Sequence, residues 1–178
     1  MRSVSGLSVR SLSGLGMSLA LLVTPLAAVR ATEGVDAAAA AVTAAPPIEQ
    51  RGWVTDAADM LTPQQRETLE RRLAGLQVAT GRETIVVTVP SLHGRDISSY
   101  ARDLGNRWAV GVPGDEGIVI LLAPTEQLVR IAVGRGLEAQ ITDAMCQDII
   151  DAAMLPEFRA GRLHEGLMAG IAALESGF

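Results

Sequence analysis

Five consecutive apolar residues, Ile118 to Leu122, constrain the fold of this chain more than any other feature. With Gly117 and Ala123 at its ends, the run is typical of a strand that has no polar side chain to turn toward water. Such a strand has to be covered on both faces. The sequence therefore predicts helices packed on either side of a central strand.

Helical patterns on both sides of this run can supply that cover. Thr62 and Pro63 are typical of a helix start, and Gly81 is a natural stop for the same helix. A second helix is expected after Asp96, and a third after Thr142. The third is expected to bury Met145, Ile149 and Ala153. A fourth helix carries one apolar stripe at helical spacing, made of Leu163, Leu167, Ile171 and Leu174.

Two more strands are expected, over residues 84–89 and 128–133, and a turn over 124–127 joins the last of them to the central strand. The order of elements is then α-β-α-β-β-α-α. Because the strands are short and the helices amphipathic, this order predicts an α/β fold, a three-layer α/β/α sandwich with a small mixed sheet and helices on both faces.

The N-terminal third differs from the rest in composition. A basic start, an apolar run over residues 12–29 and small residues around Ala28 predict a secretory signal peptide over residues 1–31. An uncleaved N-terminal membrane anchor is the alternative. Residues 32–50, rich in alanine and proline, are expected to be a flexible tether, and residues 51–178 the folded domain. Both alternatives predict a periplasmic or secreted protein, anchored at its N-terminus in the second case.

Charge limits the choice of partners. Without residues 1–31 the chain has 12 basic and 20 acidic residues, a formal charge of 12 − 20 = −8. A domain this acidic is a poor partner for nucleic acid and a reasonable one for cations. The chain contains no lysine, which excludes Schiff-base chemistry and a phosphate-loop lysine.

The sequence gives little support for a conventional nucleophilic active site or for a zinc site. A serine hydrolase needs a sharp nucleophile turn and a histidine, but no G-x-S-x-G occurs and the only histidines are His93 and His164. The single cysteine, Cys146, lies in an amphipathic pattern that predicts a buried apolar side chain. Too few histidines and cysteines exist for a typical zinc site.

Oxygen ligands are better represented. Asp115 and Glu116 lie between Gly114 and Gly117 in a loop before the central strand, and Asp56 precedes another loop. Carboxylates and carbonyls of this kind are what Ca²⁺ prefers. The three acids are therefore candidate metal ligands. A solvated acidic turn is the alternative.

A second loop follows the last predicted strand. Gly134, Arg135 and Gly136 precede Glu138, and paired glycines at such a place can form a backbone nest for an anion. Arg130 on the strand itself could reach a phosphate or carboxylate. These five residues are candidate ligand-binding residues. A tight connection and an ordinary surface arginine are the alternatives.

Together these motifs resemble the TPM domain family over about residues 51–175. The resemblance rests on Gly52 to Asp56, Leu61-Thr62, Gly111 to Leu122, Arg130 to Gly134, Gly136 to Glu138, Thr142-Asp143, Pro156, Phe158 and Gly161. It implies an α/β/α sandwich outside the cytoplasm, often tethered to a membrane. Family members include the thylakoid-lumen protein linked to photosystem II repair, for which acid phosphatase activity has been reported, and bacterial proteins of unsettled role.

The resemblance also implies a cation site at Asp115 and Glu116, with Asp56 beside them. Two functions follow as hypotheses. The first is an exported module that binds a divalent cation, Ca²⁺ or alternatively Mg²⁺ or Mn²⁺. This module would dock on an unidentified membrane protein complex or other envelope protein and assist its assembly, maintenance or repair. The second is a metal-assisted phosphatase for phosphate monoesters, in which Arg130 or Arg135 offsets the substrate's charge.

Overall fold

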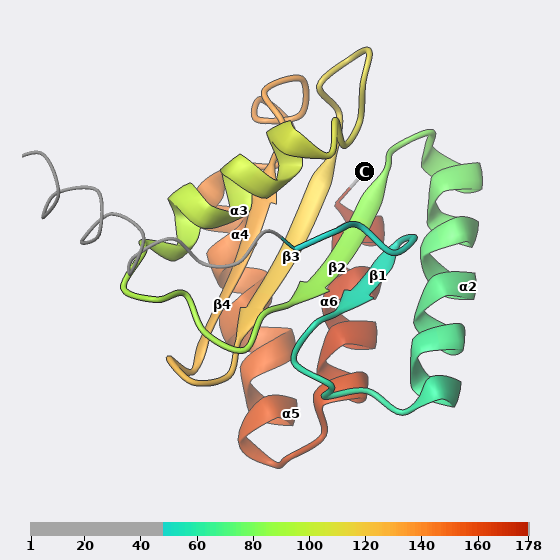
Figure 1. Cartoon of the computed structure of the whole chain (residues 1–178). Coiled ribbons are helices and arrows are strands. Elements are labelled where there is room, and N and C mark those ends of the chain that lie inside the picture. Colours follow the sequence, from blue (N-terminus) through green and yellow to red (C-terminus); the bar gives the residue numbers. More distant parts are fainter. Residues whose placement is uncertain (1–47, 178) are drawn as a thin grey trace, which may run out of the picture.

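A computed structural model describes residues 48–177, which form a four-stranded mixed sheet between helices (Figure 1). The strands lie side by side in chain order. They are β1 (Val54–Asp56), β2 (Thr84–Thr88), β3 (Ile118–Ala123) and β4 (Leu128–Val133). β1, β2 and β3 are parallel, and β4 runs antiparallel to β3. The predicted signal segment and most of the predicted tether lie outside the described residues.

Helices cover both faces of the sheet, which confirms the predicted α/β/α sandwich. α3 (Ile97–Arg107) packs on one face. Figure 1 shows it in front of the sheet, with α4 and α6 behind. The other face is covered by α2 (Pro63–Thr80), α4 (Asp143–Ile149), the π-helix η1 (Ile150–Met154), α5 (Leu155–Arg159) and α6 (Leu163–Ser176).

β3 forms the centre of the core because both its faces are buried. Ile118, Ile120 and Leu122 point into the apolar cluster on the side of α2 and α6, whereas Val119 and Leu121 point toward α3. No residue of β3 is more than 4% exposed. Each valine, isoleucine or leucine of β3 contributes about 1.5–3 kcal/mol by leaving water. The burial of both faces confirms the predicted cover.

Helix starts follow the predicted caps. Thr62 and Gln65 form the capping box of α2, and Gly81 ends that helix in the left-handed conformation. Asp96 caps α3 and Thr142 caps α4 through side-chain oxygens. These contacts are local in sequence, which is why the pattern alone predicts them.

β1 was not expected from the sequence. Three residues give too little alternation to identify a strand, and Asp56 at its end is disfavoured in strands. The strand exists because β2 offers a parallel partner, with Val54 opposite Val86 and Asp56 opposite Thr88. Trp53 and Val54 then join the core.

The inward face of the third helix differs from the prediction. Met145 is 37% exposed, and the buried set is instead Cys146, Ile150 and Met154. Both sets recur every four residues, so spacing cannot separate them. Packing against α6 decides between them, because Gly170 leaves the room that the Met154 side chain fills. The predicted burial of Cys146 is confirmed.

No helix within residues 48–177 combines the length and the apolar content needed to cross a membrane.

Two glycines within helices allow the effect of close packing to be separated from the effect of helix propensity. Gly75 in α2 has open space around it, whereas a Cβ on Gly166 in α6 would lie 2.4 Å from the Phe158 ring. We expect Gly75→Ala to raise the free energy of unfolding by up to about 1 kcal/mol. Gly166→Ala should lower it by about 1–3 kcal/mol because the same propensity gain is outweighed by overpacking. Urea denaturation of both variants measures the difference, and equal stabilities would contradict this account of the α5–α6 contact.

Candidate functional site

Two loops meet where β3 begins and β4 ends. The loop that carries Asp115 packs on Gly134 and Gly136 so closely that a Cβ on Gly134 would lie 2.1 Å from the Asp115 carbonyl oxygen. A Cβ on Gly136 would lie 2.4 Å from the Gly114 carbonyl oxygen. Only glycine permits such an approach of two backbones. The glycines that suggested an anion nest therefore serve to bring the acidic loop against the end of β4.

Asp115 is held from two sides. Its carbonyl oxygen accepts a hydrogen bond from the Gly136 N–H at 3.0 Å. Its carboxylate Oδ2 accepts one from Arg135 Nε at 2.9 Å. The Arg135 side chain is 87% exposed and the Asp115 side chain 40%, so water screens this ion pair and the net stabilisation is small. The backbone of Asp115 is therefore held against the second loop, while its carboxylate stays accessible.

A cleft of about 310 Å³ adjoins this carboxylate, between α3, β4 and the start of α4. Charged and polar side chains of both signs line it, among them Arg102, Asn106, Asp115, Arg130, Glu138 and Asp143. Arg130 donates to Asp143 Oδ1 at 2.6 Å. Its Nε is buried and has no hydrogen-bond partner among the described residues.

The structure brings most of the predicted site residues together. Asp115, Arg130, Gly134 and Glu138 line the cleft. Glu116, Arg135 and Gly136 belong to the same two loops, which touch each other. Their roles as ligands remain predictions.

Asp56 lies elsewhere, and the prediction that it shares a site with Asp115 is wrong. In the register of the sheet, Asp56 is opposite Thr88, and Thr88 is opposite Leu122 at the far end of β3. Asp115 precedes Ile118 at the near end. Four residues of strand separate the two ends, roughly 13 Å at ~3.3 Å per residue. The two carboxylates therefore lie at opposite edges of the sheet.

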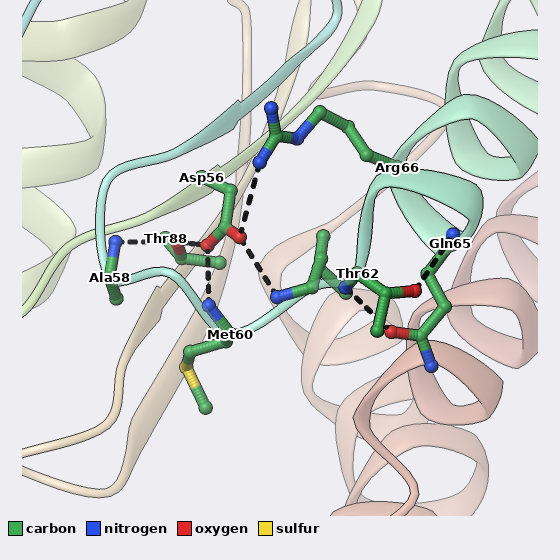
Figure 2. Close-up of polar contacts among 8 residues, drawn as sticks. Asp56, Ala58, Met60, Thr62, Gln65, Arg66 and Thr88 are labelled. Carbon is green, nitrogen blue, oxygen red and sulfur yellow. Dashed lines mark hydrogen bonds and ion pairs between the residues drawn. The ribbon is translucent and has the colours of Figure 1, made fainter.

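Asp56 has a structural role at its own edge (Figure 2). Its side chain is fully buried. Its Oδ1 accepts from the Met60 N–H at 3.1 Å and its Oδ2 from the Leu61 N–H at 2.8 Å. Oδ1 also accepts a hydrogen bond from the Thr88 hydroxyl. These contacts occupy the carboxylate and tie the loop after β1 to β2 and to the start of α2.

Apart from the helix cap Thr142, four polar residues of the cleft were not identified as site residues from the sequence. Ser98, Arg102 and Asn106 lie on one stripe of α3, each four residues from the next. This spacing is visible in the sequence but does not distinguish a cleft wall from a solvated helix face. Asp143, the fourth, looks like an ordinary first-turn acid, since helix starts favour negative charge.

The cleft contains neither a histidine nor a cysteine among the residues described. Cys146 lies in the core, where desolvation raises the pKa of its thiol to about 11. A thiol with that pKa is protonated at neutral pH and is a poor nucleophile. Within residues 48–177, no group of three His, Cys, Asp or Glu side chains is placed to hold a metal ion.

The fold and the cleft together define an α/β/α domain with a charged site at one edge of a small mixed sheet. The TPM domain model matches residues 54–176, and the chain belongs to the TPM domain family. The family resemblance predicted from the sequence is thereby confirmed. No curated protein shows significant similarity to this chain.

Solved structures of bacterial proteins share this fold. The N-terminal domain of a protein from P. gingivalis is similar with a TM-score of 0.65 and 32% identity, covering 70% of this chain and 80% of that one. The N-terminal domain of a protein from Corynebacterium glutamicum has a TM-score of 0.58 and 18% identity, over 75% and 84% of the two chains. The BA42 protein from Bizionia argentinensis has the same score and identity, over 66% and 80%. At 18% identity, the last two similarities show the fold alone.

The structural role of Asp56 predicts a stability change without a change in ligand binding. Asp56→Ala removes the acceptor of three hydrogen bonds, and we expect the free energy of unfolding to fall by about 3 kcal/mol. Asp59→Asn is the matched control, because Asp59 is exposed in the same loop. Its stability should stay within about 0.5 kcal/mol of wild type. Urea denaturation measures both. If Asp56→Ala kept full stability and lost affinity for calcium, a metal-ligand role would be restored.

Proposed function

We propose that this protein is an exported TPM-domain module that binds a divalent cation at the Asp115 loop and docks on an envelope membrane complex to assist its assembly, maintenance or repair. The observation that carries this proposal is the convergence of the Asp115 loop with the Gly134–Glu138 loop at the mouth of the cleft. The backbone of Asp115 is held there by the Gly136 N–H, and its carboxylate pairs with one exposed arginine, Arg135. An accessible carboxylate in a cleft whose described residues include no histidine or cysteine favours binding over nucleophilic catalysis.

The oxygen atoms available at the Asp115 loop are of the type that a hard cation prefers. Asp115, Glu116 and Glu138 offer carboxylates, and the touching loops offer carbonyl oxygens. Ca²⁺ takes six to eight oxygen ligands, whereas Mg²⁺ and Mn²⁺ need fewer and a tighter arrangement. Arg135 pairs with Asp115 only at the surface, so a cation can replace it at small cost.

The same donor set links the cation to docking. The described residues contain no group of three acidic, histidine or cysteine ligands around one point. The shell of a bound cation would therefore be completed by water or by oxygens of a partner. We infer that the cation bridges the module to an acidic or carbonyl-rich surface of its partner.

Export is part of the proposal. It is supported by the basic and apolar segment over residues 1–31 and by the formal charge of −8 on the remainder. Whether the segment is cleaved or remains as an anchor, the domain would face the periplasm or the exterior, and residues 32–50 would let it reach a partner at the membrane.

Calorimetry on the full chain tests the cation site. We expect calcium to bind with a Kd of about 10⁻⁴–10⁻³ M, the range of extracellular modules. Asp115→Asn should weaken binding at least about tenfold, because it removes the charged ligand. Glu67→Gln, an exposed change on α2, is the control and should bind as wild type does.

Sedimentation with envelope membranes tests docking in the same proteins. Wild type and Glu67→Gln should co-sediment in calcium and be released by a chelator. Asp115→Asn should remain in the supernatant. If calcium gave no heat of binding with either wild type or Asp115→Asn, the cation site would be rejected. If co-sedimentation persisted in the presence of chelator and in Asp115→Asn, the cation bridge to the partner would be rejected.

The second candidate function is a metal-assisted phosphatase for phosphate monoesters. It is favoured by one observation, the buried Nε of Arg130, which has no acceptor among the described residues and lines the cleft together with Arg102. A phosphate oxygen is a suitable acceptor for such a group. No side chain of the cleft is identified as its general acid or base.

A generic phosphate ester separates the two functions. If the protein is a phosphatase, wild type should release phosphate with Ca²⁺, Mg²⁺ or Mn²⁺ supplied, and Arg130→Gln should lower kcat/KM by about tenfold or more. Arg107→Gln at the exposed end of α3 is the control. Absence of turnover with all three cations would leave the binding module as the function.

A further inference from the structure

A second hollow lies at the opposite edge of the sheet, where β3 passes into β4. It has a volume of about 680 Å³, within the range of small-molecule sites. Its floor is made by Leu122 and Ala123 at the end of β3, which are almost fully buried. We call it the apolar groove. It shares no residue with the charged cleft.

One wall of the apolar groove depends on a π-helix. The Leu155 N–H bonds to the Ile150 carbonyl five residues back, and Pro156, which has no N–H, follows directly. The wider turn carries the chain from α4 into α5 and places Leu155 and Phe158 against the groove. The Phe158 ring packs against Gly166 of α6, in the space that a Cβ on that residue would occupy. Short π-helical segments of this kind are often found at functional sites.

The opposite rim exposes apolar side chains. Leu128 at the start of β4 is 45% exposed, and Met60 is 38% exposed. Met60 is held there because its N–H bonds to the buried Asp56 carboxylate at 3.1 Å. Both residues belong to the few large apolar side chains that the described residues leave open to water, and they flank one groove.

One positively charged side chain lines the apolar groove among the described residues. Arg159, the last residue of α5, is the only charged side chain that lines it in the part of the chain described here. No carboxylate within residues 48–177 pairs with Arg159. Its neighbour Arg162 differs, since Arg162 Nε donates to Glu157 Oε2 at 2.5 Å. A groove with apolar walls and one arginine that has no carboxylate partner in the described region is suited to a ligand with an apolar body and a negatively charged end.

We propose that the apolar groove binds a single-chain amphiphile with a carboxylate head. The alkyl chain lies between Leu128 and Phe158, where burial of its methylene groups drives binding. The carboxylate pairs with the guanidinium of Arg159, which supplies two parallel donors. A cationic head would meet a like charge there, and a neutral head would leave Arg159 without a partner.

Dodecanoate is the probe for this site. We expect calorimetric titration of the full chain, below the micellar concentration and without calcium, to show binding at least about tenfold tighter than that of dodecyltrimethylammonium. Arg159→Gln should weaken dodecanoate by about tenfold and leave dodecyltrimethylammonium no weaker. Leu128→Glu should weaken dodecanoate by tenfold or more, because it places a negative charge at the apolar rim.

Matched variants control for general effects. Arg107→Gln removes an arginine from the exposed end of α3, and Val78→Glu adds a charge to an apolar side chain that is 89% exposed on α2. Both should bind dodecanoate as wild type does. Circular dichroism checks that every variant is folded, which is expected because all four changes are at exposed positions.

Three results would overturn the proposal: no dodecanoate binding, equal affinity for the anionic and cationic probes, or binding that Arg159→Gln and Leu128→Glu leave unchanged. The last result would assign binding to another apolar part of the chain. Asp115→Asn should bind dodecanoate normally, so the outcome here is independent of the calcium proposal.

Discussion

Burial of β3 on both faces is the constraint on which the rest of this structure depends. Its six residues place alternate side chains into two separate apolar clusters, and neither cluster exists without helices to close it. α3 closes one face, and α2, α6 and the α4–α5 segment close the other. Since β3 is covered on both faces, the two hollows form around it. The charged cleft extends along β4 from the start of β3, and the apolar groove lies at the end of β3.

The two ends differ because they are built by different kinds of contact. At the start of β3, glycines let two loops approach backbone to backbone, which leaves Asp115 facing solvent beside a cleft of mixed charge. At the end of β3, the π-helical segment places Leu155 and Phe158 beside Arg159, and the hydrogen bond from the Met60 N–H to Asp56 holds Met60 at the same groove. The proposed ligands are divided between these two surfaces, a cation with its partner at the charged cleft and an apolar chain with a negative head at the apolar groove.

Asp56 was predicted to be a metal ligand, but in the structure its carboxylate holds the loop after β1. An acid next to a loop looks the same in the sequence whether it binds a ligand or holds its own backbone. What separates the two cases is the direction and register of β1, which put Asp56 beside Thr88 and far from Asp115. β1 has only three residues, too few to identify a strand or its direction from the sequence. The N–H groups of Met60 and Leu61 then donate to the two carboxylate oxygens.

The layers of this domain, the caps of its helices and the two loops around Asp115 and Gly134 are all predictable from the sequence. These follow from apolar periodicity, from cap residues and from glycine, all of which act over a few neighbouring positions. The sequence does not reveal which acids share an edge, which face of α4 is buried, or that Arg130, Arg102 and Asp143 meet in one cleft. Nor does it reveal that Leu128, Phe158 and Arg159 line one groove. The physical reason is that these contacts join segments far apart in the chain, and their placement depends on strand register and on close packing between helices.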